Sequence, residues 1–249
     1  MTQKTLLITG ASRGIGAATA IRAAREGWHV AVHYHQNSQA AQDVCDAITH
    51  AGGQANAFAA DMASESDIKN LFDRVLAHYG RLDGLVNNVG ITPLLGRVDE
   101  MEALRLNQIF TTNITSAFLC CGHAVKAMST RYGHAGGVIV NVSSRAAQLG
   151  SANRYVDYAA SKAALDTLTI GLAREVTMEG IRVNSVRPGM IDTSIHDKNG
   201  GREDLNRVTS TIPMQRIGTP DEVASAIVWL LSEDSRYCTG TFVDVAGGR

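Results

Sequence analysis

The chain alternates short apolar runs with longer amphipathic stretches along its whole length, and this alternation limits its fold more than any other feature. The apolar runs lack regular polar alternation, which is typical of strands covered on both faces. They are Leu6–Thr9, Val30–His33, Ala55–Ala60, Gly84–Asn87, Val138–Val142, Arg182–Val186 and Thr241–Val245. Helical patterns separate them at 15–27, 38–51, 66–79, 101–130, 156–179 and 220–232. This alternation predicts an α/β fold, a doubly wound parallel sheet of about seven strands with helices on both faces.

The domain organisation follows from how these elements are joined. No low-complexity linker and no internal repeat interrupts the pattern, so we predict a single domain over residues 1–249. The stretch 189–213 has no clear period and contains Gly200, Gly201 and Pro213. Long irregular segments inside compact domains are usually functional, so we predict a substrate lid at 189–213, with a surface excursion as the alternative.

Composition narrows the classes of partner. The formal net charge of −1 gives no basic surface of the kind that binds nucleic acid or an anionic membrane, so we expect neither partner. No stretch approaches the roughly 18 apolar residues of a membrane span, and the N-terminus has no signal-peptide pattern; we expect a cytoplasmic protein. Cys45, Cys120, Cys121 and Cys238 show no metal-ligand spacing, which favours reduced thiols and no metal site.

A glycine-rich turn, Thr9–Gly16 (TGASRGIG), follows the first predicted strand and opens the first predicted helix. Helix N-termini present unpaired N–H groups and the positive end of the helix dipole, so they bind phosphate well. Gly10 allows the tight turn, Gly14 lets the backbone approach a pyrophosphate, and Gly16 permits close packing of helix on strand. The context predicts a dinucleotide site, although the spacing G-x-x-x-G-x-G also fits a plain turn.

The end of the second predicted strand bears on the choice of cofactor. Dinucleotide-binding folds often have an acidic residue there, which bonds the adenosine ribose and would repel a 2′-phosphate. This chain has Tyr34 and His35 instead, and no Asp or Glu in 32–37. Arg13 in the glycine turn can supply a positive charge, helped by His35, with a solvated helix-start arginine as the alternative. The pattern favours NADP(H), and NAD(H) is the second choice.

Tyr158 and Lys162 lie four residues apart in the predicted helix 156–179, so they share one face of it. A free tyrosine titrates near pH 10, and a nearby ammonium lowers its pKa by favouring phenolate. Ser144 ends a predicted strand, where parallel sheets place ligand-facing residues, and its hydroxyl could bond a substrate oxygen. Asn113 lies inside a predicted helix, where asparagine has poor propensity and needs a reason. Each of these residues alone could equally be a packed core residue or a solvated surface charge. Together they indicate a site for acid–base catalysis.

These motifs together resemble the short-chain dehydrogenase/reductase family. They occur in the family's order and span almost the whole chain. The matching motifs are the glycine turn, Asn87-Asn88-Val89-Gly90, Asn113, Ser144, Tyr158 with Lys162, Arg187-Pro188-Gly189, 220–223 and 239–244. The resemblance implies a single-domain Rossmann-type fold and an NAD(P)(H)-dependent oxidoreductase that interconverts a carbonyl and a secondary alcohol by hydride transfer. Within the family, the chain is most similar to bacterial glucose dehydrogenase-like and 3-oxoacyl-carrier-protein reductase-like members.

The resemblance also implies roles for the matched residues. Tyr158 would be the general acid/base, and Lys162 would hold the nicotinamide ribose and lower the pKa of the tyrosine. Ser144 would orient the carbonyl, and Asn113 would anchor a water in a proton relay through Lys162. The implied cofactor contacts are Gly10, Ser12, Arg13, Gly14, Ile15, Gly16, Tyr34, His35, Asp61, Met62, Asn87, Val89, Gly90, Tyr158, Lys162, Pro188, Gly189, Ile191 and Thr193.

Three of these contacts carry a more specific implied role. Asn87 would support the central sheet and line the adenosine side of the cofactor. Asp61 matches the carboxylate that meets the adenine amino group, and Thr193 matches the residue that reaches the nicotinamide carboxamide.

Two features depart from the family pattern. Val89 stands where the Asn-Asn motif usually continues with alanine, and a modest backbone adjustment should absorb the extra methyl groups. The spacing from serine to tyrosine is 158 − 144 = 14 residues, whereas the family commonly shows about 13, so Ser143 stays an alternative to Ser144. Tyr155 is also near in sequence, but only Tyr158 is followed four residues later by lysine.

Assembly and substrate are further expectations from the resemblance. It implies a homotetramer with two-fold interfaces, built by the helix face 117–128 and by 223–231 with the terminal strand. The expected substrate is a small carbonyl or alcohol compound. A 3-oxoacyl-carrier-protein reductase is the alternative activity, and its carrier protein could dock at Arg131 and Arg174. These two arginines also fit ordinary surface charges. A dinucleotide-binding regulator without turnover is the alternative from another class. The histidines of 29–35 are expected to be strand or surface residues.

Overall fold

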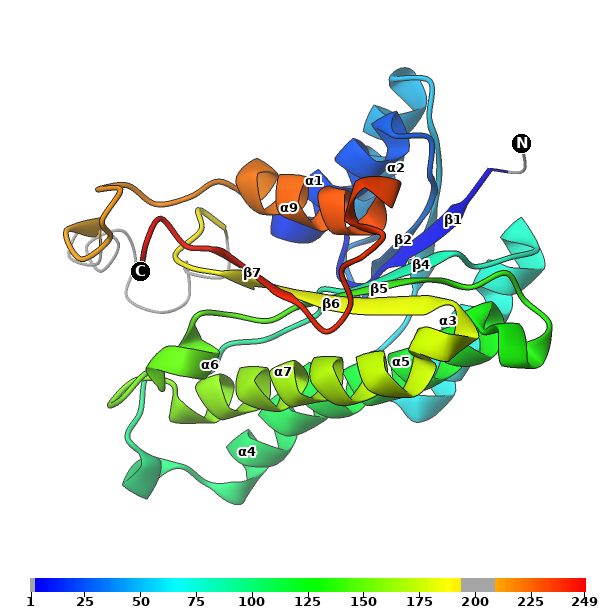
Figure 1. Cartoon of the computed structure of the whole chain (residues 1–249). Helices are drawn as coiled ribbons and strands as arrows, with labels where there is room; N and C mark the ends of the chain where they lie inside the picture. The colour runs from blue at the N-terminus through cyan, green and yellow to red at the C-terminus, as the bar shows by residue number, and fades with distance from the viewer. Residues whose placement is uncertain (1–2, 194–208) are drawn as a thin grey trace.

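A parallel sheet of seven strands forms the centre of the computed structural model, which describes residues 3–193 and 209–249 (Figure 1). The strands lie in the order β3-β2-β1-β4-β5-β6-β7. Their bounds are β1 Thr5–Ile8, β2 His29–Tyr34, β3 Gln54–Ala59, β4 Gly84–Asn87, β5 Gly137–Val142, β6 Ile181–Pro188 and β7 Phe242–Val245. The order reverses between β1 and β4, and such a switch point is where doubly wound sheets bind ligands. The predicted fold class is confirmed.

Helices cover both faces of this sheet (Figure 1). One face carries α1 (Gly14–Arg25), α2 (Ser38–His50) and α9 (Pro220–Leu231). The other carries α3 (Glu65–Tyr79), α5 (Ser116–Met128) and α7 (Val156–Val176). The shorter α4 (Ala103–Phe110) and α6 (Ala146–Leu149) lie toward the edge where the strands end (Figure 1).

The side chains of β1 show how the sheet joins two hydrophobic cores. All four of its residues are buried. Leu6 and Ile8 belong to the core under α1, α2 and α9, whereas Leu7 belongs to the core under α3, α5 and α7. Successive strand side chains point to opposite faces, and each buried leucine or isoleucine contributes about 1.5–3 kcal/mol. A strand covered on both faces therefore needs the uninterrupted apolar run that the sequence shows.

The helix predicted over 101–130 is interrupted in the structure. After α4, the chain forms a π-helical turn at Thr111–Thr115 and then continues directly into α5. A π-turn adds one residue to the helical circuit and is frequent at functional sites. Asn113 lies in its middle and is 1% exposed. The stretch is helical as predicted, but the π-turn within it was not foreseen, because apolar periodicity continues on both sides of the inserted turn.

The predicted lid at 189–213 falls mostly outside the described residues, since 194–208 are not described. Its first part is held to the fold, because Ile191 pairs with Gly218 in an isolated parallel bridge. The lid therefore stays a prediction. In the described part of the chain, no helix has the length and apolar character that crossing a membrane requires.

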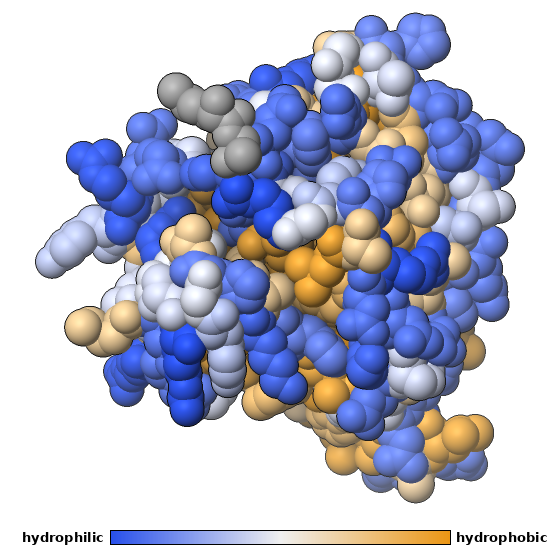
Figure 2. All heavy atoms as spheres, turned by 90° about the vertical axis from the view of Figure 1, so that its right-hand side faces the viewer, coloured by the Kyte–Doolittle hydropathy of each residue, from blue (hydrophilic) through white to orange (hydrophobic). Residues whose placement is uncertain are grey.

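Most of the face shown in Figure 2 is hydrophilic, with hydrophobic residues gathered in a central area and at one lower corner. Several large apolar side chains are exposed on the described residues as a whole. Phe118 on α5 is 53% exposed, and Ile170 on α7 is 38% exposed. Single exposed apolar residues are ordinary, but apolar residues on adjacent helices make a candidate contact surface.

Candidate active site

The first turn of α1 lacks a side-chain cap. Arg13 occupies the N-cap position without a side-chain hydrogen bond to the helix, and the first turn has no acidic residue. By contrast, the side chains of Asn37, Ser64 and Thr219 accept hydrogen bonds at the starts of α2, α3 and α9. The first N–H groups of α1 are thus left for a ligand, and the helix dipole favours an anion there.

Glycines shape a narrow backbone cradle before this helix. Gly10 and Gly14 have φ angles of 63° and 56°, in the left-handed region that glycine adopts without strain. A side chain on Gly16 would collide with the carbonyl oxygen of Gly10 and the side-chain amide of Asn88. These three positions therefore require glycine, and the open backbone of the cradle suits the pyrophosphate of a dinucleotide.

Asn88 holds the cradle in place from the end of β4. Its Nδ2 donates to the carbonyl oxygens of Thr9 at 2.9 Å and Gly10 at 3.0 Å, and its N–H donates to Thr9 Oγ1 at 2.9 Å. The neighbouring Asn87 is buried, and its Nδ2 donates to Asn141 Oδ1 at 2.9 Å. Asn87 thus joins β4 to β5 as expected, whereas Asn88, which the predicted contacts omitted, is the residue that fixes the turn.

Three residues predicted to meet the adenosine half of the cofactor lie where β2 and β3 end. Tyr34 closes β2, and His35 Nε2 lies 3.9 Å from Asp61 Oδ2, with both side chains about half exposed. Asp61 Oδ1 also accepts from the N–H of Ala63 at 2.9 Å. Arg13 is exposed and forms no ion pair with any described residue, so its guanidinium is available to a ligand.

The predicted serine and tyrosine meet at the edge where β5 ends. Burial raises the pKa of Tyr158 above its ordinary value, and a hydrogen bond with the side chain of Ser144 opposes this rise. The net direction is opposite to the expected lowering, because loss of water around the phenol outweighs every favourable contact. The ring of Tyr155 instead contacts its chain neighbour, since the guanidinium of Arg154 lies 5.7 Å from its centroid.

Lys162 is buried one helical turn below this pair. It is 3% exposed, and its Nζ donates to the carbonyl oxygen of Val142 at 2.7 Å while lying 5.7 Å from the Tyr158 ring centroid. Burial lowers the pKa of Lys162 to about 8, and the charge of Asp166 opposes the shift. A Cβ at Gly90 would lie 3.2 Å from Nζ, so glycine keeps the space beside the ammonium open.

Asn113 joins the π-helical turn to the loop after β4. Its Oδ1 accepts from the N–H of Ile91 at 2.8 Å. Its Nδ2 donates to the carbonyl oxygen of Ile91 at 3.0 Å and to Ser161 Oγ at 3.1 Å. Because the side-chain amide is used in this way, a water in the predicted relay would have to bond the main-chain carbonyl of the π-turn.

Ser143, the alternative to Ser144, faces the interior. Its hydroxyl donates to the main-chain carbonyl oxygen of Lys162 at 3.1 Å, and the residue is 3% exposed. It therefore braces α7 against β5. The geometry favours Ser144 as the serine that a substrate oxygen can reach.

A chain of alternating charges, which the sequence did not predict, connects α7 to the last strand. Asp166 Oδ2 accepts from Arg187 Nε at 2.9 Å, and Arg187 Nη1 lies 3.8 Å from Asp244 Oδ1. Asp244 Oδ2 in turn accepts from Arg145 Nη1 at 2.7 Å, and Arg145 directly follows Ser144. The Arg187 guanidinium also lies 3.8 Å from the ring centroid of Phe242. These contacts connect the helix that carries Tyr158 and Lys162 with the segment that directly follows Ser144.

The segment assigned to the nicotinamide lies against the glycine turn. The N–H of Gly189 donates to the carbonyl oxygen of Val245 at 2.9 Å, which extends the pairing beyond Pro188 at the end of β6. Thr193 Cγ2 lies 3.4 Å from the point that a Cβ on Gly14 would occupy. The two halves of the predicted cofactor site are therefore neighbours in space.

Comparison with known proteins agrees with this geometry. The family described as "Enoyl-(Acyl carrier protein) reductase" matches residues 10–249. The "Uncharacterized oxidoreductase YgfF" of Escherichia coli (strain K12) is 52% identical over 243 residues, which are 98% of each chain. "Glucose 1-dehydrogenase 2" of Bacillus subtilis (strain 168) is 35% identical over 100% of this chain and 95% of the relative. A solved short-chain dehydrogenase/reductase from Serratia marcescens BCRC 10948 is 32% identical, with a TM-score of 0.91 over 99% of this chain and 98% of that one.

The chain is a short-chain dehydrogenase/reductase. As such, it is an oxidoreductase that interconverts a carbonyl and an alcohol with a nicotinamide dinucleotide. The residues of this short-chain dehydrogenase/reductase fit that cofactor: an uncapped helix and a glycine cradle suit its phosphates, and Gly90 leaves room beside the Lys162 ammonium.

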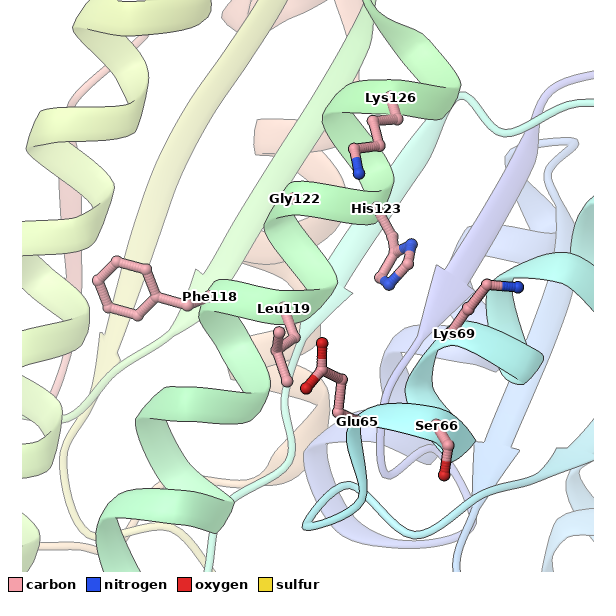
Figure 3. A pocket seen from close by; sticks show the side chains of 8 residues that line it. All are labelled: Glu65, Ser66, Lys69, Phe118, Leu119, Gly122, His123 and Lys126. Atoms are coloured by element: carbon pink, nitrogen blue, oxygen red, sulfur yellow. The ribbon is translucent and has the colours of Figure 1, made fainter.

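A separate hollow of about 520 Å³ lies between α3 and α5 (Figure 3). It contains none of the predicted catalytic or cofactor residues and is lined by Glu65, Ser66, Lys69, Phe118, Leu119, Gly122, His123 and Lys126. Figure 3 shows Phe118 on the far side of α5 from α3, toward α7. The hollow is therefore a surface feature beside the exposed apolar part of α5.

The cysteines of this short-chain dehydrogenase/reductase differ in burial. Cys45, Cys120 and Cys121 are buried, and Cys238 is partly exposed. Burial raises the pKa of Cys45 to about 11 and that of Cys121 to about 12. Within the described ranges, no group of three or more His, Cys, Asp or Glu residues is arranged to hold a metal ion.

Proposed function

We propose that this short-chain dehydrogenase/reductase is an NADP(H)-preferring enzyme that reduces a ketone and oxidises a secondary alcohol, with Tyr158 as general acid/base. The observation that supports this best is the contact of the Ser144 and Tyr158 side chains beside the buried Lys162. A hydroxyl that can orient a carbonyl, a phenol that can protonate it and a cation then share one site. A dinucleotide-binding regulator would need only the nucleotide site.

The proposed mechanism assigns one task to each side chain. The bound cofactor supplies or takes up the hydride. Ser144 donates a hydrogen bond to the carbonyl oxygen and holds it beside the Tyr158 hydroxyl. Tyr158 then delivers its proton as negative charge develops on that oxygen, and its raised pKa keeps the phenol protonated at neutral pH. Lys162 holds the nicotinamide ribose and stabilises the remaining phenolate.

Reprotonation of Tyr158 completes the cycle. Lys162 Nζ lies 5.7 Å from the Tyr158 ring centroid, and its pKa of about 8 lets the amine exchange protons near neutrality. We assign Asn113 the role of anchoring the connecting water, through its main-chain carbonyl, because its side chain is bonded to Ile91 and Ser161. In alcohol oxidation the same groups act in reverse.

The proposed preference for NADP(H) depends on charge at the adenosine end. Tyr34 and His35 stand where an acidic residue would repel a 2′-phosphate, and Arg13 has an uncommitted guanidinium. Among the proposed cofactor contacts, Asp61 is the only residue with a carboxylate, and His35 lies beside that carboxylate. A cation paired with phosphate contributes about 1.5–3 kcal/mol, enough to separate the two cofactors.

A substrate panel tests the proposed function directly. Purified protein is mixed with NADPH or NADH and with a sugar, an aldehyde, a ketone or a 3-oxoacyl thioester, and the nicotinamide absorbance is followed. We expect turnover of at least one carbonyl compound, faster with NADPH, and no turnover by Tyr158→Phe. Cofactor binding without turnover of any carbonyl or alcohol would contradict the proposal and support the regulator.

We further propose that the enzyme works as a homotetramer in the cytoplasm. Exposed Phe118 on α5 and Ile170 on α7 offer one apolar surface, and exposed Trp229 on α9 offers a second. Two different self-complementary surfaces on one chain generate a tetramer with two-fold axes.

A further inference from the structure

The side chain of His33, at the end of β2, is buried beneath the glycine turn and is bonded at both ring nitrogens. It is 1% exposed. Its Nδ1 lies 2.9 Å from the N of Gly10, and its Nε2 lies 3.1 Å from the carbonyl oxygen of Ala60. The Gly10 N–H can only donate and the Ala60 carbonyl can only accept. The ring is therefore neutral, with its proton on Nε2.

These two bonds tie together the segments that surround the adenosine half of the proposed cofactor site. Gly10 begins the phosphate cradle, and Ala60 immediately precedes Asp61. The main chain makes parallel links, since Ala11 N donates to the His33 carbonyl at 2.8 Å and Ala60 N donates to the Tyr34 carbonyl at 3.0 Å. The imidazole on β2 thus links the cradle after β1 to the segment directly after β3.

We propose that His33 is a positioning residue for the nicotinamide dinucleotide, holding the phosphate cradle and the adenine-facing carboxylate of Asp61 at a fixed separation. This inference rests on the proposed function, because it requires the cofactor to bind across both segments. His33 is a strand residue, as expected for the histidines of 29–35, and the inference adds a role that the sequence did not predict. Without the ring, the partly buried Gly10 N–H would lose its acceptor, in a turn whose positive φ residues other than glycine resist.

The surroundings of His33 keep it neutral. Burial lowers the pKa of His33 to about 4; the Ala60 carbonyl opposes this shift, His35 adds to it and Asp61 opposes it. Gly10 in the turn and Ala60 just after β3 are bonded to the ring nitrogens, and neither carries a titratable side chain. A protonated ring would turn an N–H toward the Gly10 N–H, so the link requires the neutral form. Above about pH 5 the link should therefore be independent of pH.

Three substitutions separate the two hydrogen bonds. In His33→Asn, the amide oxygen takes the place of Nδ1 and can accept from Gly10. In His33→Gln, the longer side chain can donate to Ala60 but does not present the same acceptor to Gly10. His33→Leu removes both bonds while keeping apolar bulk. His29→Leu is the matched control, since His29 lies on the same strand and its Nε2 has no hydrogen-bond partner among the described residues.

The measurements are NADPH affinity by fluorescence titration, kcat at saturating cofactor and substrate, and the urea midpoint. For His33→Leu we expect the Kd for NADPH to rise about tenfold to a hundredfold, with kcat at saturation nearly unchanged. His33→Asn should recover most of the affinity, and His33→Gln should recover less. Long-range ¹H–¹⁵N spectra of the wild type should show His33 protonated at Nε2 and unchanged between pH 5 and pH 8.

Two outcomes would overturn this inference. If His33→Leu binds NADPH as the wild type does, or if His33→Asn is no better than His33→Leu, the ring has only a packing role. A loss of urea stability equal to that of His29→Leu, without a change in Kd, supports the same conclusion. Failure of the wild type itself to bind NADPH or NADH would instead refute the proposed function.

Discussion

Tyr158 carries the proton in the proposed reaction, so its hydroxyl can be tested alone. Tyr158→Phe keeps the ring and its packing near Lys162 and removes only the hydroxyl that contacts Ser144. We expect kcat to fall by about 10²–10⁴-fold or more, with the affinity for NADPH unchanged. Steady-state rates and a cofactor titration measure the two quantities. A variant that keeps wild-type kcat would remove Tyr158 from the mechanism.

Lys162 sets the expected pH dependence of carbonyl reduction. Its pKa is lowered from 10.5 to about 8. The Lys162 amine is therefore fully protonated well below pH 8 and loses its positive charge above pH 8. Tyr158, whose pKa is raised, stays protonated over the same range. We therefore expect kcat/KM for NADPH to be level below about pH 8 and to fall above it. Lys162→Met should abolish this fall and weaken both cofactor binding and rate; a variant that retains both would place Lys162 outside the mechanism.

Arg13 is the residue on which the cofactor preference turns. Its guanidinium is exposed at the N-cap of α1 and makes no ion pair with a described residue. We expect the wild type to prefer NADPH over NADH, and Arg13→Ala to reduce this preference about tenfold to a hundredfold. The ratio of kcat/KM for the two cofactors, before and after the change, is the measurement. Equal ratios in both proteins would show that Arg13 does not meet the 2′-phosphate.

At the scale of secondary-structure elements, the charge chain from α7 through β6 to β7 bears on Lys162. The negative charge of Asp166 raises the pKa of Lys162, and its carboxylate is held by Arg187. Asp166→Asn should therefore move the high-pH fall in kcat/KM to a lower pH, while the rate at pH 6 changes less. Asp46→Asn, on the exposed side of α2, is the control. An unshifted profile would mean that the pair only fastens α7 to β6.

The elements themselves were largely predictable from the sequence. Central strands buried on both faces demand continuous apolar runs, and all seven strands, including the more exposed edge strands β3 and β7, lie at the runs that the pattern indicated. The period of the apolar residues could not predict the π-helical turn at Thr111–Thr115, because one added residue does not disturb the apolar faces of α4 and α5. The signal was Asn113 itself, a poor helix former whose side chain bonds the loop at Ile91.

The candidate site was predictable wherever spacing along the chain carries the information. Tyr158 and Lys162 share a helix face, and the glycine turn joins a strand to a helix. His33, Asn88 and Asp166 were missed because their partners are distant in sequence: Gly10 lies 23 residues from His33, and Arg187 lies 21 residues from Asp166. Only the folded sheet brings such groups together.

At the scale of the whole molecule, the proposed tetramer can be tested through α5. Phe118 is 53% exposed, so the folded subunit does not need it in its own core. Phe118→Glu should split the tetramer into smaller species, because a desolvated carboxylate has no partner in an apolar interface. Light scattering after size-exclusion chromatography gives the mass, with Gln42→Glu on exposed α2 as the control. An unchanged tetramer would exclude this part of α5 from the interface.

The four cysteines differ in burial, so a thiol-specific reagent can distinguish the native protein from the unfolded protein. Cys45, Cys120 and Cys121 are enclosed, with the pKa of each raised by burial, whereas Cys238 is partly exposed just before β7. A maleimide dye attacks thiolates, so brief labelling of the native protein should attach a single dye at Cys238. Labelling in urea should attach dye to the other three as well. The number of dyes per chain, counted by mass spectrometry, then records global opening without any assay of turnover.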